Sequence, residues 1–278
     1  MIKKIYQLAD IHIPTYQKLE MYATQLEKTV QLIAQDAEAS GLQRDEMRIV
    51  ICGDLVNSKN TVTNELNVFV SSFIRELANI CKVLVIAGNH DLIESNTSRT
   101  DTLTAIFQTA KFDPNDAVFI DMSLDYESGA LIDDNVIWAL YSIYDDFKGP
   151  NIEPLKKSYP DKQIIGLFHG LIVGCKLFNG FVGDSGCDNS LFDGCDVVMA
   201  GHIHKRQIIE GNDCKIVYVG STVQKNFGES LTQHGFAVWN VPSLECTFID
   251  VPSEYGYFDM TINNFDDFKE DKEILNNY

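Results

Sequence analysis

The first 110 residues alternate between short apolar runs and longer amphipathic stretches. The short runs predict strands over Lys4–Ala9, Arg48–Cys52 and Val83–Ala87. Apolar positions at helical spacing predict helices over Tyr16–Ala39, Thr63–Ile80 and around Asp101–Ala110. The order strand, helix, strand, helix, strand is typical of a parallel sheet with helices packed against it.

From about Ala117 the pattern changes to short apolar runs separated by turn residues. These runs predict strands over Ala117–Ile120, Ala130–Ile132, Val136–Tyr141, Gln163–Phe168, Val197–Met199, Gln207–Ile209, Lys215–Val219, Phe236–Trp239 and Glu245–Ile249. Asp133-Asp134-Asn135 predicts a hairpin turn. We therefore expect a second, mixed or antiparallel sheet stacked on the first, which gives an α/β fold of two stacked sheets flanked by helices.

Length and periodicity indicate how the chain is divided. The 278 residues can bury one sizeable core and a smaller appendage. We predict a single domain over residues 1–250. Periodicity weakens from about Pro252, so residues 251–278 are expected to form a tail or to begin a small capping domain.

Composition and cysteine pattern indicate the class of protein and its compartment. The hydrophobic share of 45% and the charged share of 22% are those of a soluble globular protein. The apolar run at the N-terminus is interrupted by Gln7 and Asp10, and we identify no signal peptide or membrane span. The seven cysteines are scattered without a C-x-x-C pair, which favours reduced thiols in a cytoplasmic protein and no cysteine zinc site.

Five polar fragments each follow a predicted strand. They are Asp10-Ile11-His12, Gly53-Asp54, Gly88-Asn89-His90-Asp91, His169-Gly170 and Gly201-His202-Ile203-His204. In open α/β sheets, ligands bind outside the carboxyl ends of the strands, so the five fragments are expected to converge on one rim.

The residue types in these fragments indicate a metal centre. A lone histidine after a strand is more often structural, but five of the six histidines lie in these fragments. Aspartate, histidine and asparagine suit Mn²⁺, Fe²⁺ or Zn²⁺ without thiolates. In Asp-x-His and His-x-His, alternate residues of an extended segment point the same way and can reach one metal cluster.

The full set resembles the calcineurin-like metallophosphoesterase family, whose pattern is D-x-H, G-D, G-N-H-D/E, H and G-H-x-H. The resemblance spans residues 10–204 and implies a four-layer sandwich with two divalent metal ions. By this resemblance the first ion is held by Asp10, His12 and His204. The second is held by Asn89, His169 and His202, and Asp54 bridges the two. A hydroxide shared by the ions then attacks phosphorus in line.

The same resemblance assigns the acid step to His90, which stabilises developing charge or protonates the leaving oxygen. Three residues after Asp54, many family phosphatases have Asp and nuclease relatives often have His, but this chain has Asn57. Asn57 is expected to orient His90 by a hydrogen bond without raising its pKa as a carboxylate does. Asp91 is expected to close its loop by hydrogen bonding.

A narrower resemblance lies after the last paired histidine. Three segments resemble the nuclease subunit of DNA double-strand-break repair complexes, of the bacterial SbcD and phage recombination endonuclease type. They are Gln224-Lys225-Asn226-Phe227-Gly228-Glu229 and the earlier segments Gln7–His12 and Gly53–Val56. This implies Mn²⁺-dependent exonuclease and endonuclease cleavage of DNA, and an SMC-like ATPase partner of the SbcC type. It also implies a homodimer through the helices Thr63–Ile80 and Asp101–Ala110, whose apolar faces are equally suited to packing on the sheet, so both alternatives stay open.

The net charge of −18 opposes a nucleic-acid surface and is most simply a solvated acidic exterior. DNA affinity then comes from the partner, or from basic residues in loops near the site: Lys59, Arg99, Lys176, Lys205, Arg206 and Lys225. Two alternatives stay open. One is a phosphomonoesterase or cyclic-nucleotide phosphodiesterase with a small substrate. The other is a non-catalytic scaffold, although such proteins typically lose a ligand.

Overall fold

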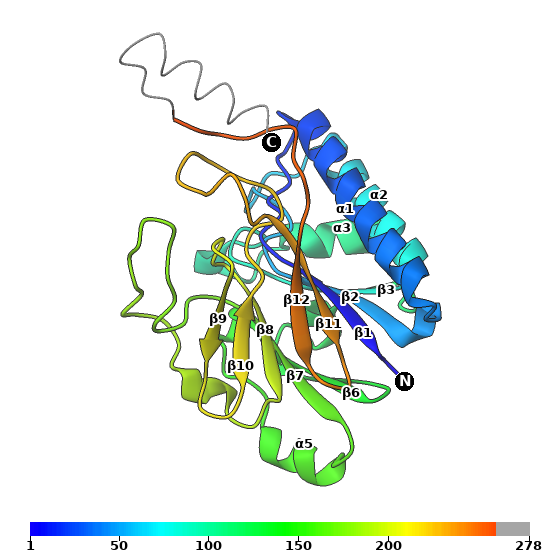
Figure 1. Ribbon diagram of the computed structural model, residues 1–278, viewed down its shortest axis with the longest axis vertical. Coiled ribbons are helices and arrows are strands. Elements are labelled where there is room, and N and C mark those ends of the chain that lie inside the picture. The colour runs from blue at the N-terminus through cyan, green and yellow to red at the C-terminus, as the bar shows by residue number, and fades with distance from the viewer. Residues whose placement is uncertain (260–278) are drawn as a thin grey trace.

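Two six-stranded sheets pack face to face in the computed structural model, which describes residues 1–259 (Figure 1). The first sheet has the order β12-β11-β1-β2-β3-β4 and the second β5-β6-β7-β8-β10-β9. The strands of the first sheet are β1 (Lys4–Leu8), β2 (Met47–Cys52), β3 (Lys82–Ile86), β4 (Ala117–Phe119), β11 (Gly235–Asn240) and β12 (Glu245–Asp250). Those of the second are β5 (Gly129–Asp133), β6 (Val136–Tyr141), β7 (Gln163–His169), β8 (Val197–Gly201), β9 (Gln207–Glu210) and β10 (Lys215–Tyr218).

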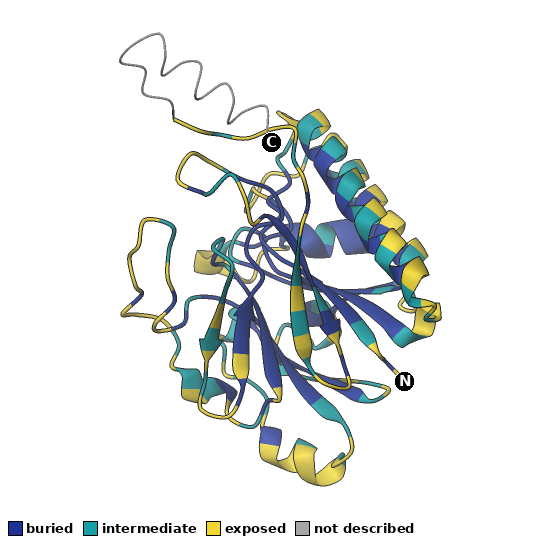
Figure 2. Cartoon of the chain, in the orientation of Figure 1, coloured by how far each residue is buried: buried dark blue, intermediate teal, exposed yellow. Residues whose placement is uncertain are grey.

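Helices flank the two sheets. They are α1 (Leu19–Ser40), α2 (Asn64–Ile80), α3 (Thr102–Ala110), α4 (Ile120–Ser123) and α5 (Ile152–Ser158). α4 is the exception, a single turn whose Ile120 packs between the sheets. α1, α2 and α3 lie against the first sheet, and α5 lies against the second (Figure 1). The central strands are buried on both faces, as Figure 2 shows, and for this reason they read as continuous apolar runs. The prediction of two stacked sheets flanked by helices is confirmed.

The assignment of strands to sheets needs a correction. All strands after residue 117 were expected in the second sheet, but β4, β11 and β12 belong to the first. β4 pairs in parallel with β3 because α3 returns the chain to the same sheet. β11 pairs antiparallel with β1, so that Trp239 lies opposite Ile5. β12 pairs antiparallel with β11 and therefore joins the same sheet. Both sheets are therefore mixed.

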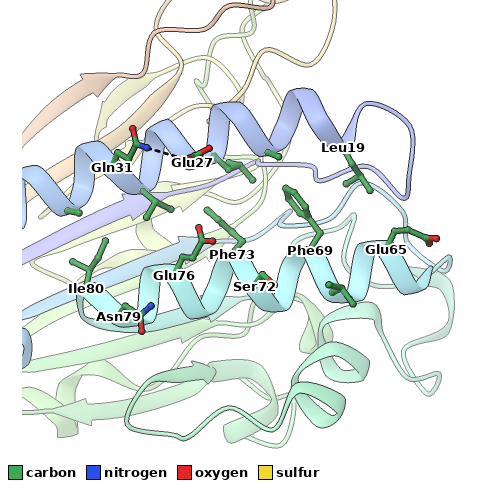
Figure 3. Close-up of a pocket in the computed structure, with 15 residues that line it drawn as sticks. Leu19, Glu27, Gln31, Glu65, Phe69, Ser72, Phe73, Glu76, Asn79 and Ile80 are labelled. Atoms are coloured by element: carbon green, nitrogen blue, oxygen red, sulfur yellow. Dashed lines mark hydrogen bonds between the residues drawn. The ribbon is translucent and has the colours of Figure 1, made fainter.

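The side-by-side helices α1 and α2 leave a groove between them (Figure 3). Thr63 caps α2 by accepting the Leu66 N–H at 3.1 Å, and α1 ends at Gly41, whose φ of +66° suits glycine. The groove has a volume of about 730 Å³. Phe69, Phe73 and the acidic Glu76 of α2 line it on the side that faces α1.

The part of the predicted tail that the structure describes, residues 251–259, packs along the main domain without helix or strand. Gln224 exchanges two hydrogen bonds with the Tyr257 backbone, and Glu254 pairs with Lys28 at 2.7 Å. A capping domain would involve residues 260–278, which lie outside the described residues. Up to residue 259, no helix combines the length and apolar character needed to cross a membrane.

An ion pair between a buried arginine and a half-buried aspartate joins the two sheets, and its loss is expected to destabilise the fold. Arg48 of β2 donates Nε and Nη2 to the two carboxylate oxygens of Asp133 at the end of β5, at 2.7 and 2.8 Å. Asp133→Ala leaves the buried guanidinium unpaired, so the free energy of unfolding should fall by about 3 kcal/mol. Urea denaturation followed by circular dichroism measures this loss. An Arg48→Met/Asp133→Leu double variant should recover most of it. If Asp133→Ala shifts the midpoint no more than an exposed Asp184→Asn control, the pair contributes nothing.

Candidate metal centre

The five polar fragments meet at the carboxyl ends of β1, β2, β3, β7 and β8. The chain turns sharply as it leaves the strands, and Asp10, His12 and Asp54 all have positive φ angles, of 51°, 54° and 52°. Gly53 is required at its position, because a Cβ there would lie 2.2 Å from His169 Nδ1. The predicted convergence on one rim is thus present in the structure.

Asp10, His12 and His204 form the first group of ligand atoms. Each offers one atom within 4.8 Å of the others. His12 Nε2 and His204 Nε2 face each other at 3.0 Å, and His204 Nε2 lies 3.7 Å from Asp10 Oδ1. Asp10 is completely buried, and its carboxylate also accepts the His202 backbone N–H.

Asn89, His169 and His202 form the second group. Asn89 Oδ1 lies 3.3 Å from His169 Nε2 and 2.9 Å from His202 Nδ1. Asp54 stands between the groups, with Oδ1 3.4 Å from His169 Nε2 and Oδ2 3.5 Å from His12 Nε2. All seven residues predicted as ligands are therefore brought together, and Asp54 faces both groups.

The electrostatics of the centre fit divalent cations. Burial raises the pKa of Asp10 to about 6 even though the nearby His204 and His169 rings oppose this rise, and a bound cation would favour its ionised form. Burial acts in the same direction on Asp54, but the neighbouring His169 and His12 rings hold its pKa well below the usual range. Buried carboxylates, an amide oxygen and several converging imidazole nitrogens form a donor set suited to Mn²⁺, Fe²⁺ or Zn²⁺.

His90 lies at the edge of the same centre. Its backbone N–H donates to Asp54 Oδ1 at 2.7 Å, and its ring stands edge-on to that of His12 with centroids 4.7 Å apart. His90 Nδ1 donates to the backbone carbonyl of Asn57 at 3.1 Å. Asn57 thus makes a hydrogen bond to His90, as expected, but with its main-chain carbonyl rather than with its side chain, and the residue is exposed.

Asp91 closes its loop by hydrogen bonding, as expected. Its carboxylate is fully buried and accepts the backbone N–H groups of Val56 at 3.0 Å and Gly88 at 2.8 Å. Burial raises its pKa to about 8. Asp91 thus ties the loop after β2 to the loop after β3 without facing the centre.

Glu229 is a functional residue that sequence reasoning missed. Its Oε1 accepts a hydrogen bond from His204 Nδ1 at 2.6 Å. Its Oε2 accepts hydrogen bonds from the Ser221 hydroxyl at 3.1 Å and from the Lys225 backbone N–H at 3.0 Å. This contact fixes the His204 proton on Nδ1 and leaves Nε2 free for a metal. The sequence did contain a signal for it, because Glu229 ends the Gln224–Glu229 stretch. We used that stretch only as evidence of resemblance to the nuclease subunits.

Loss of Glu229 is expected to weaken metal binding. Glu229→Ala removes the acceptor that orients His204, so metal affinity should fall roughly 10- to 100-fold. Titration calorimetry with Mn²⁺ measures the change. Glu229→Gln retains an oxygen that can accept a hydrogen bond from His204 Nδ1, so its loss of Mn²⁺ affinity should be smaller. Equal affinity in Glu229→Ala and the wild type would show that His204 needs no such partner.

A cleft of about 480 Å³ opens beside the second group. Asn89, His169 and His202 form one side of it. Its other lining residues include the aromatic Tyr144 and Phe147 and the acidic Glu94 and Asp146. The cleft thus adjoins the second ligand group.

Comparisons with known proteins agree with this geometry. A family model described as calcineurin-like phosphoesterase matches residues 3–206. An uncharacterized protein of Acanthamoeba polyphaga mimivirus is 29% identical over 262 residues, which are 92% of this chain and 18% of that protein, so the chain spans less than a fifth of the relative's length. A dimetal phosphatase from Danio rerio superposes with a TM-score of 0.51 at 12% identity, covering 85% of this chain and 92% of the other. At that identity the likeness shows the fold.

Proposed function

The chain belongs to the calcineurin-like phosphoesterase family, and on that premise we propose that it cleaves the phosphodiester bonds of DNA. Metal-dependent hydrolysis of a phosphoester is the activity of the family, and the chain has candidate groups for holding the metals. The observation that carries the proposal is the convergence of both ligand groups on Asp54, beside His90. We further propose that Mn²⁺ is the ion used.

The residues of the chain divide the work between holding ions and handling protons. When bound, two divalent ions supply an activated water and offset the negative charge of the phosphate oxygens. Asp54 faces both ligand groups and would hold their ions at a fixed separation. Hydrogen bonds from Nδ1 of His169 to the Cys52 carbonyl and from Nδ1 of His204 to Glu229 keep Nε2 of each ring facing the centre.

His90 is proposed to act on the leaving oxygen. The Asn57 carbonyl can only accept, so it holds a proton on His90 Nδ1 and leaves Nε2 for the substrate. A proton on Nε2 can then pass to the oxygen as the P–O bond breaks. The edge-on contact with His12 holds the ring beside the centre.

Two features support DNA as the substrate, and one opposes it. The Gln224–Glu229 stretch resembles nuclease subunits, and it packs directly on the centre through Glu229. The cleft is lined in part by the aromatic rings of Tyr144 and Phe147, and an unpaired base could stack on the faces that their packing against Tyr126 and Phe168 leaves open. The net charge of −18 opposes DNA binding, and we propose that an SMC-like ATPase partner supplies the basic surface.

DNA cleavage by the purified chain tests the proposal. Linear duplex and single-stranded DNA are incubated with Mn²⁺, with and without chelator, beside a His90→Ala variant. We expect degradation that needs metal and is lost in the variant. Rapid turnover of bis(p-nitrophenyl) phosphate without DNA cleavage, including after addition of the ATPase, would overturn the assignment to DNA.

The second candidate is a phosphomonoesterase or cyclic-nucleotide phosphodiesterase with a small substrate. The net charge of −18 and the acidic Asp146 at the cleft favour this candidate, because they repel a chain of many phosphates more than a single small phosphoester. Comparing kcat/KM for small diesters and monoesters with that for a DNA oligonucleotide separates the two candidates.

We also propose a homodimer formed through α2 and α3, which follows from the nuclease resemblance. Most apolar residues of both helices pack on the first sheet. Val68 of α2 is 67% exposed and Phe69 lines the neighbouring groove, so α2 keeps apolar surface for a second copy. Light scattering after size exclusion should report twice the chain mass. A monomer at micromolar concentration would overturn this proposal.

A further inference from the structure

Lys225 brings a cationic side chain to the edge of the metal centre. It lies on the loop after β10, and its Nζ is 3.0 Å from His12 Nδ1. The loop backbone is fixed, because Glu229 accepts the Lys225 backbone N–H and Gln224 donates to the Glu229 carbonyl at 3.1 Å. The side chain is half-buried.

The contact between Lys225 and His12 conflicts with metal binding by His12. The ring faces the centre with Nε2, which lies 3.0 Å from His204 Nε2 and 3.5 Å from Asp54 Oδ2. A neutral imidazole that binds a metal through Nε2 carries its proton on Nδ1 and is a donor there. A lysine ammonium also has only donors. The observed contact is therefore a hydrogen bond only while Nε2 does not bind an ion.

An ion on His12 Nε2 deprives the Lys225 ammonium of its acceptor on His12 and leaves the ammonium free to bind an anion at the centre. Both carboxylate oxygens of Glu229 already accept hydrogen bonds, from His204 on one side and from Ser221 and the loop backbone on the other. Asp10 and Asp54 belong to the ligand groups. A phosphate held at the centre presents anionic oxygens, and lysine binds phosphate as a flexible point charge.

Two other basic residues near the site, Lys59 and Arg206, are already engaged. Lys59 pairs with Glu94 at 2.6 Å. Arg206 pairs with Asp250 at 2.5 Å and stacks on Phe248. Lys225 differs from both because its ammonium contacts a predicted metal ligand.

We propose that Lys225 binds the phosphate group of the substrate, and that its ammonium and a metal ion compete for His12. The proposal rests on phosphoester hydrolysis as the function and identifies a substrate-binding residue for it. Metal binding then releases the lysine for the substrate, so phosphate and metal should each favour the binding of the other.

The test compares Lys225→Met and Lys225→Arg with the matched control Lys176→Met, which removes the same charge from an exposed loop. Titration calorimetry uses Mn²⁺ alone, and then inorganic phosphate added to the Mn²⁺-loaded protein. Lys225→Met should bind Mn²⁺ alone roughly tenfold more tightly and phosphate roughly tenfold more weakly. With bis(p-nitrophenyl) phosphate the effect should fall on KM rather than on kcat. Lys225→Arg should recover phosphate binding.

Three results would overturn the proposal. Weaker Mn²⁺ binding by Lys225→Met would make the lysine a neutral acceptor that orients His12. Unchanged phosphate affinity would remove its role in substrate binding. Equal changes in Mn²⁺ and phosphate affinity in Lys176→Met would mean that the net charge of the protein, and not the position of Lys225, causes the change. These binding measurements need neither DNA nor turnover, so a wild-type protein that fails to cleave DNA counts against the proposed function alone.

Discussion

Asp54→Asn is expected to remove the paired metal ions and to lower kcat/KM on the order of 10³-fold or more. Asp54 is 2% exposed and is the one predicted ligand whose two oxygens face different groups, His169 on one side and His12 on the other. An asparagine keeps one oxygen and turns an NH₂ donor toward the other group. It also removes a negative charge that balances two cations.

Two measurements on the same preparation check this prediction. Metal content after dialysis against Mn²⁺ should fall from two ions per chain to one or none. Turnover of bis(p-nitrophenyl) phosphate should fall in parallel. An exposed carboxylate gives the matched control, because Asp184→Asn removes the same charge without contacting the centre. Retention of both ions by Asp54→Asn would mean that the bridge is not needed to hold them.

The residues of the centre could be predicted because each follows a strand whose apolar run is visible in the sequence. Parallel strands of one sheet end at a common edge, which groups Asp10, Asp54 and Asn89 in the first sheet and His169 and His202 in the second. The meeting of the two edges depends on how the sheets stack, and the family resemblance rather than the local pattern indicated it. The pairing of strands far apart in sequence has no such local signal. Which sheet receives a late strand depends on long-range packing, and the sequence alone therefore did not place β11 beside β1.

The contacts that orient the ligands were also invisible in the sequence. Glu229 reaches His204 from 25 residues away, through a loop whose path is set by hydrogen bonds of Ser221 and Gln224. Side-chain type at Asn57 suggested an amide contact with His90, but the structure uses the main-chain carbonyl. Any residue at position 57 presents a carbonyl, so the amino-acid type there carries little information about this contact.

Because His90 contacts the main chain of Asn57 and not its side chain, substitutions of His90 and of Asn57 should have different effects. His90→Ala should lower kcat for DNA by roughly 10²- to 10⁴-fold, because a positioned proton donor is lost. Metal content should stay at the wild-type level. A loss of ions would instead make His90 a ligand, since its ring lies within 4.8 Å of ligand atoms on His12 and Asp54.

The leaving group distinguishes proton donation by His90 from a merely structural role. p-Nitrophenolate leaves readily without a proton, so the loss in His90→Ala should be much smaller with bis(p-nitrophenyl) phosphate than with DNA. Asn57→Ala is the matched control, because it keeps the carbonyl that accepts from His90 Nδ1. We expect its kcat to stay within about threefold of the wild type. If Asn57→Ala is as damaging as His90→Ala, the asparagine side chain acts in the reaction after all.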